Sequence, residues 1–192
     1  VTGIAGCGKT TLVSDWFQSK KGNFEGFSTM YYPCQTWDTA TGLATSIIHR
    51  ILFDHSHDIL DPYDLISTLP SPGINFDHDQ FRRRLTATLL DEDHELGRAT
   101  RFLLILDDIH NLDNDGIRLI GVLIQIAEAC KSKIIGISRS SPEFYDRRDV
   151  LTRGRVTEIP LKGLTERELG EWIRHIGLDE EVSPEILHEK TG

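Results

Sequence analysis

Apolar runs alternate with amphipathic runs along this chain, which is the pattern of a parallel β-sheet flanked by helices. The run FLLILDD, Phe102 to Asp108, contains no polar residue until its end. A strand covered on both faces has this composition, so we expect the run in the middle of the sheet. The fold class is therefore expected to be α/β, with candidate strands at Val1–Thr2, Phe27–Pro33, Arg101–Asp107, Lys133–Ser138 and Arg155–Leu161.

Helical patterns fill the intervals between these strands. Near the start, the pairs Leu12/Trp16 and Val13/Phe17 have four-residue spacing and predict a helix that lays one face on the sheet. Asp38 is a candidate cap for a second helix, whose apolar stripe continues through positions 43, 47 and 51.

Further along, two signals mark a helix start and one marks a buried helix. Asp77 and Gln80 have the spacing of a capping box, and Phe76 with Phe81 has that of a hydrophobic staple. The segment Asp115–Cys130 is too broadly apolar for a helix that lies on water, so we expect it to pack under a neighbour.

The C-terminal part begins a second unit. Thr165 and Glu168 form another capping box before an amphipathic stretch, and Ser183-Pro184 starts a last helix. We therefore divide the chain into a core at 1–163, with a surface insertion at 55–75, and the start of a helical lid at 164–192. Because the first residue is Val and the opening strand is very short, we interpret the chain as a segment of a larger protein.

Composition narrows the classes of partner. The chain has 192 residues and a formal net charge of -9, which argues against a direct grip on nucleic acid. Its three cysteines are far apart, so they form neither a disulfide framework nor a paired metal site. No apolar run is long enough to span a membrane. We therefore expect a cytoplasmic protein without a membrane partner.

The stretch GIAGCGKTT satisfies the pattern G-x-x-x-x-G-K-[ST] of the phosphate-binding loop. Glycines let the backbone turn tightly around an anion, so that successive N–H groups point at phosphate oxygens at the start of a helix. Lys9 would reach the β- and γ-phosphates, and the Thr10 hydroxyl would bind Mg²⁺. The expected nucleotide-binding residues are Gly3, Gly6, Cys7, Gly8, Lys9, Thr10 and Thr11.

Two acids follow the most apolar strand. Asp107 ends this strand, so it is the expected water-mediated partner of Mg²⁺ together with Thr10. Adjacent strand residues point apart, so Asp108 is the candidate for orienting or deprotonating the attacking water. His110 is close enough in sequence to meet either acid or the nucleotide, and a plain loop histidine is the alternative.

Arg139 follows the next strand, KIIGIS. Its planar donor fork could distinguish a triphosphate from a diphosphate, whereas the alternative is a solvated surface arginine. With Lys9 and Asp108, Arg139 completes the set of expected catalytic residues.

Four segments together resemble one family: VTGIAGCGKTTLVSDW, FLLILDDIHNLD, IIGISRS and IPLKGLTERELGEWI. In this order they resemble the nucleotide-binding domain of STAND signal-transduction ATPases, which are relatives of AAA+ proteins and include NB-ARC, NACHT and MalT-like members. The resemblance implies a P-loop NTPase three-layer sandwich, with a five-stranded parallel sheet in the order 5-1-4-3-2. It also implies ATP or ADP with Mg²⁺ at Gly6, Gly8, Lys9, Thr10 and Asp107, and a γ-phosphate sensor at Arg139.

The resemblance further implies a mode of action. Members rest with ADP enclosed, exchange it for ATP when a sensor region is relieved, and then form homo-oligomers that drive an effector. Asp108 stands where typical AAA+ motors have Glu, which implies slow hydrolysis.

Three functions therefore remain. The first is a slowly hydrolysing ATPase that acts as a nucleotide switch in a signalling or regulatory protein. The second is a non-catalytic module in which nucleotide organises an interface with partner domains. The third is an AAA+ ring motor with an arginine finger, for which the candidates are Arg147, Arg148 and Arg153.

Overall fold

The computed structural model of the chain describes residues 1–53, 66, 67, 69, 75–90, 101–140, 156–175 and 177. Most of the expected insertion at 55–75, the candidate arginine fingers and the Ser183-Pro184 helix start lie outside these residues. No helix among the described residues is long and apolar enough to cross a bilayer.

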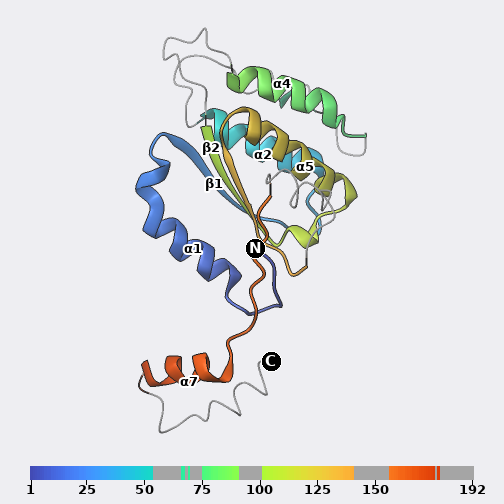
Figure 1. Cartoon of the computed structure of the whole chain (residues 1–192). Coiled ribbons are helices and arrows are strands. Elements are labelled where there is room, and N and C mark those ends of the chain that lie inside the picture. The colour runs from blue at the N-terminus through green and yellow to red at the C-terminus, as the bar shows by residue number, and fades with distance from the viewer. Residues whose placement is uncertain are drawn as a thin grey trace.

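Helices lie between the successive strands of the described residues (Figure 1). The α-helices are α1 (Lys9–Lys20), α2 (Ala40–Phe53), α4 (His78–Leu90), α5 (Asn114–Ala129) and α7 (Glu166–His175). The strands are β1 (Phe27–Pro33), β2 (Arg101–Asp107) and β3 (Lys133–Gly136), and two short 3₁₀ helices are η1 (Lys21–Phe24) and η2 (Ile109–Asn111).

The three strands form one parallel sheet in the order β1-β2-β3. The central position of the FLLILD strand is as predicted. Three strands rather than five are formed in the described residues, because the two other candidate segments pair at single positions only: Thr2 makes isolated parallel bridges to Ser138 and to Pro160. These bridges place residue 2 between the extension of β3 and the segment that leads to α7.

Strand β2 supplies both faces of the core because its side chains alternate across the sheet. Leu104 and Leu106 belong to a large apolar cluster shared with α2, α4 and α5. Leu103 and Ile105 join Val13 of α1 in a smaller cluster on the opposite face. The sheet therefore lies between α1 on one side and α2 with α5 on the other (Figure 1).

Helix α1 confirms one of its two predicted apolar pairs. Val13 is buried, with Phe17 packed against the same small cluster, as predicted. Leu12 and Trp16 were expected to pack on the sheet as well, but they remain 45% and 37% exposed. The two pairs lie on adjoining stripes of the helix, and only the stripe of Val13 and Phe17 packs against the sheet.

The cap of α2 differs from the prediction by one residue. Thr39, not Asp38, accepts a hydrogen bond from the backbone N–H of Gly42, at 3.1 Å. Since an N-cap oxygen reaches the N–H two or three residues further on, the residue just before Ala40 has the right position. The Asp38 carboxylate instead accepts from the N–H of Gln35, at 2.7 Å, and closes the preceding turn.

The other helix signals agree with the structure. Asp77 accepts from the N–H of Gln80 at 2.8 Å, and the rings of Phe76 and Phe81 lie 5.4 Å apart. Helix α5 is covered by α4, as its broad apolar surface predicted. Helix α7 begins at the predicted Thr165 capping box and lies apart from the sheet (Figure 1).

Candidate functional site

The glycine loop leads directly into α1. Gly8 is the N-cap of the helix, with φ 84° and ψ 17°, a left-handed conformation that glycine adopts without steric cost. No side chain caps this end, so the first N–H groups of the helix have no side-chain acceptor. A helix start with free N–H groups and the positive end of the helix dipole favours an anion.

Gly3 is required for a different reason, namely close packing. A Cβ atom at this position would overlap the carbonyl oxygen of Leu161 and would lie 2.8 Å from the sulfur of Cys7. The backbone just before Gly3 is paired with the same segment, since the Thr2 N–H donates to the carbonyl oxygen of Ile159 at 3.0 Å and the Leu161 N–H donates to that of Thr2 at 2.6 Å. The start of the loop is therefore fastened to the segment that leads to α7.

The Lys9 ammonium lies inside the loop. Its Nζ donates to the carbonyl oxygens of Gly3, at 2.9 Å, and of Ile4, at 2.7 Å, and lies 3.8 Å from the sulfur of Cys7. The residue is only 8% exposed although it carries a charge. Buried lysines are rare unless they are paired with an anion. Here the ammonium donates to neutral carbonyl oxygens and to a sulfur, so the loop is a favourable place for an anion.

Asp107 is the point at which three elements meet. Its Oδ2 atom accepts hydrogen bonds from the Thr10 hydroxyl of α1, at 2.8 Å, and from the Tyr31 hydroxyl of β1, at 2.9 Å. Its Oδ1 atom accepts from the backbone N–H of Asp108, at 2.8 Å. The carboxylate is buried and fixed, and it joins the loop helix to the central strand, as the sequence predicted for the pair Thr10 and Asp107.

Tyr31 was not identified from the sequence as a site residue. It lies two residues before Pro33, which pairs with Asp107 in the β1–β2 register, so Tyr31 and Asp107 point to the same face. Although about half of the residue is exposed, partial desolvation and then the hydrogen bond to Asp107 raise the pKa of the Tyr31 phenol to about 12. The parallel register of the two strands is the signal that would have revealed it.

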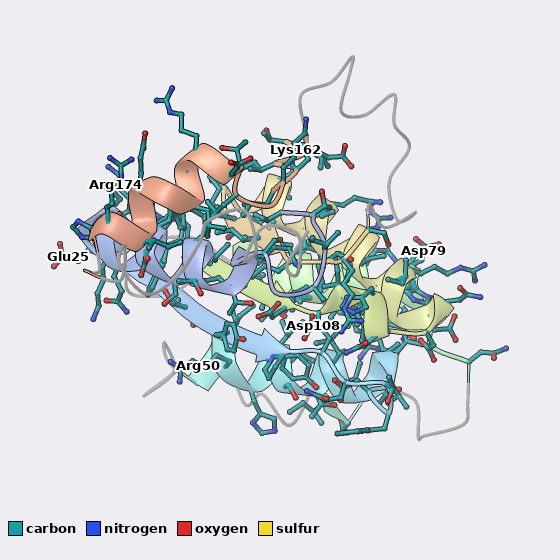
Figure 2. All side chains as sticks on the ribbon, turned by 90° about the horizontal axis from the view of Figure 1, so that it is seen from below. Glu25, Arg50, Asp79, Asp108, Lys162 and Arg174 are labelled. Atoms are coloured by element: carbon teal, nitrogen blue, oxygen red, sulfur yellow. The ribbon has the colours of Figure 1, made fainter. Side chains whose placement is uncertain are left out.

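Asp108 has surroundings unlike those of Asp107. Its backbone is left-handed, with φ 52° and ψ 39°, a conformation that Asp tolerates better than most residues. Its side chain is 51% exposed, and its Oδ1 atom lies 3.8 Å from Nδ1 of His110, too far for a hydrogen bond. The two acids therefore point apart, and Asp108 is labelled in Figure 2 at the end of the sheet where β2 gives way to η2.

The remaining predicted residues lie nearby, without contacts to Asp107. Gly6 and Thr11 are exposed, and Cys7 is half-buried within the loop. Arg139 is exposed and directly follows Ser138, whose backbone pairs with the residues just before the loop. The structure joins Thr10 to Asp107, keeps the Lys9 ammonium within the loop, and leaves Asp108 and Arg139 exposed.

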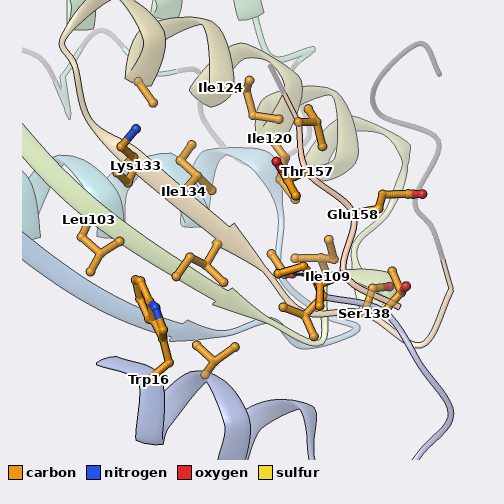
Figure 3. A pocket seen from close by; sticks show the side chains of 18 of the residues that line it. Trp16, Leu103, Ile109, Ile120, Ile124, Lys133, Ile134, Ser138, Thr157 and Glu158 are labelled. Carbon is orange, nitrogen blue, oxygen red and sulfur yellow. Dashed lines mark hydrogen bonds between the residues drawn. The ribbon is translucent and has the colours of Figure 1, made fainter. Parts of the chain in front are cut away.

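A cavity of about 970 Å³ lies beside β3 (Figure 3). Its walls are mainly apolar and come from α1, α5, β3 and residues 156–159. Leu12 and Trp16, the exposed pair of α1, line it, but none of the predicted site residues does. The cavity is therefore separate from the cluster around Asp107.

Comparison with solved structures identifies the fold. The chain is similar to the Orc1 protein of Aeropyrum pernix, solved in complex with DNA, with a TM-score of 0.53, 18% identity and 91% of this chain covered. It is also similar to Cdc6p from Pyrobaculum aerophilum, with a TM-score of 0.55, 18% identity and 90% covered.

At 18% identity these likenesses concern the fold alone: this chain has an α/β fold with a parallel sheet, similar to that of the two archaeal proteins. The match spans 41% of each neighbour's length. No family model and no curated protein matches the sequence.

Proposed function

We propose that this chain is a nucleotide switch domain that binds ATP or ADP with Mg²⁺ and hydrolyses ATP slowly. The observation that supports this best is the 2.8 Å hydrogen bond between Thr10 and Asp107, which lie 97 positions apart in the chain. A hydroxyl from the loop and a carboxylate from the central strand are oxygen ligands of the kind that Mg²⁺ prefers.

The donors in the loop fit the phosphates of a nucleotide. The uncapped start of α1 offers N–H groups, and the Lys9 ammonium lies within the loop. A phosphate oxygen is a stronger acceptor for Lys9 than the two carbonyls it contacts, because a hydrogen bond between two charges is stronger. Bound Mg²⁺ would neutralise charge on the β- and γ-phosphates.

Asp108 and Arg139 are proposed to act at the exposed rim of this site. Asp108 would orient or deprotonate water, and Arg139 would respond to the γ-phosphate. Their position supports these roles, since one follows β2 and the other follows the extension of β3, which pairs with the residues before the loop.

The resemblance to STAND ATPases supports a regulatory role. We propose a resting state closed around ADP and a homo-oligomer after exchange for ATP, controlled by sensor and effector domains. The two bridges of Thr2 support the five-stranded order 5-1-4-3-2. We propose with it a core at 1–163 and the start of a helical lid at 164–192. Cytoplasmic location and the absence of a direct nucleic-acid partner belong to the same proposal.

The test is to identify nucleotide carried through purification by the wild-type protein and by Lys9→Ala. We expect ADP in near-stoichiometric amount, released by denaturation and identified by chromatography, in the wild type alone. Wild-type protein that carries no nucleotide and binds no added Mg-ATP would contradict the proposal.

A second candidate is a nucleotide-binding module without catalysis. The observation that favours it is the setting of Asp108, whose carboxylate is half exposed and lies 3.8 Å from Nδ1 of His110, beyond hydrogen-bond distance. In this case nucleotide would only organise contacts with partner domains. Replacing Asp108 would then have no effect, because the wild-type protein would not hydrolyse ATP.

A further inference from the structure

Tyr31 is a residue to which the expected nucleotide chemistry assigns no role, yet it contacts the central acid of the site. Its hydroxyl and the Thr10 hydroxyl share one oxygen of Asp107, Oδ2, at 2.9 and 2.8 Å. They approach from different elements, since Tyr31 belongs to β1 and Thr10 to α1.

Packing does not account for this tyrosine. The residue is 53% exposed, whereas its neighbours along the strand, Met30 and Tyr32, are more buried. A phenylalanine would keep the same ring at the same place. What the hydroxyl adds is one hydrogen bond, and that bond ends on a buried carboxylate.

The two hydroxyls on Oδ2 are not equivalent in the proposed site. Thr10 is itself an expected ligand of the cation, so its hydroxyl has a second use when Mg²⁺ is bound. Tyr31 lies outside the loop, on the strand next to Asp107 in the sheet. Its hydrogen bond to Oδ2 is therefore a hold on the carboxylate that does not depend on the loop or on a group that also binds the cation.

We propose that Tyr31 is the positioning residue of the magnesium site, holding the Asp107 carboxylate from β1. This inference rests on the proposed function. Hydrogen bonds to carboxylates around a metal fix their orientation, and removing such a partner typically lowers metal affinity by about 10- to 100-fold. Asp107 is expected to act on Mg²⁺ through water, so we expect the lower end of this range.

The test is Tyr31→Phe, with Tyr32→Phe as the matched control. Tyr32 is the next residue of the same strand, and its hydroxyl bonds to Asp38 rather than to Asp107. Binding of fluorescent ADP is measured in EDTA and then as a function of magnesium chloride concentration. Thermal unfolding without nucleotide is recorded for each protein.

For Tyr31→Phe we expect an unchanged affinity for ADP in EDTA and about a 10-fold higher Mg²⁺ concentration at half-maximal enhancement of binding. Tyr32→Phe should keep the wild-type value. An equal magnesium midpoint in Tyr31→Phe and the wild type would overturn the inference, as would the same shift in both variants. If the wild type binds no ADP at all, the proposed function fails first and the role of Tyr31 fails with it.

Discussion

Asp107 and Asp108 are adjacent in the chain, but their carboxylates have opposite surroundings. Asp107 is buried and accepts three hydrogen bonds, whereas the Asp108 side chain is half exposed beside His110. A fixed carboxylate suits a structural or metal-binding role, and an exposed one suits contact with water. Single mutations can therefore test the roles of the two residues separately.

Asp108→Asn is expected to abolish most ATP hydrolysis and to leave nucleotide binding unchanged. Asn tolerates the left-handed backbone of this position as Asp does, so the change removes the charge without forcing the turn. Loss of a general base typically costs about 10²- to 10⁴-fold in rate. Phosphate release and ADP affinity are measured side by side, and equal turnover in both proteins would favour the non-catalytic module.

The three cysteines should differ in their reaction with iodoacetamide. Burial, and then the charge of Asp38, raises the pKa of the Cys34 thiol to about 12, and burial raises that of Cys130. Since the thiolate is the nucleophile, both should stay unmodified at pH 8. Cys7 is half-buried in the loop and should react.

Nucleotide should protect Cys7 because the residue lies between Gly6 and Gly8 in the loop. Peptide mass spectrometry with and without Mg-ADP measures this, and Lys9→Ala serves as the unprotected control. Alkylation of Cys7 at the same rate in both conditions would indicate that nucleotide does not enter the loop.

Among the elements, α7 has the clearest electrostatic start. The Glu168 carboxylate accepts from the backbone N–H of Thr165, at 2.8 Å, and from its hydroxyl, at 2.7 Å. These bonds, the backbone one first, lower the pKa of Glu168 below its ordinary value of 4.5. The carboxylate is therefore stabilised in its charged form.

Acid should weaken the start of α7 for this reason. Since the pKa is lower in the folded helix than in the unfolded chain, the capping box contributes fully above pH 4.5 and is lost as the pH falls through the lowered pKa. The Cα chemical shifts of Glu168 and Leu169 should move toward coil values in that range. In Glu168→Gln this transition should be absent, and its persistence would assign it to another group.

Local signals predicted most elements, and two of the departures have a common cause. FLLILDD and the boxes at Asp77 and Thr165 depend on neighbours in sequence, so they could be found from the chain alone. The exposure of Leu12 and the contact of Tyr31 with Asp107 depend on which helix face meets the sheet and on strand register. These are tertiary properties that no single segment encodes.

At the scale of the molecule, the net charge bears on whether this chain has a nucleic-acid partner. The Orc1 structure contains DNA, whereas this chain has a net charge of -9. Charged side chains such as Asp79, Lys162 and Arg174 lie at the outer edge of the fold and carry both signs (Figure 2). A field of this kind does not attract a phosphate backbone.

We therefore expect binding to a labelled DNA duplex at low salt to be too weak to measure. The expected Kd is above about 100 µM, which is the weak end of non-specific binding. Fluorescence anisotropy measures this, with and without Mg-ATP. Salt-dependent binding in the micromolar range would show that a local basic surface outweighs the overall charge.

The packing of Gly3 leads to an expectation for any relative of this protein in which nucleotide binding has been lost. Its missing side chain accommodates the Leu161 carbonyl, a packing requirement that stays in force whether or not phosphate ever enters the loop. Lys9 has no comparable packing role, since its side chain donates to two carbonyl oxygens of the loop. In such relatives we expect the lysine to be replaced by other residues while the glycine is kept. A glycine at this position would then indicate a shared fold and would not by itself indicate nucleotide binding.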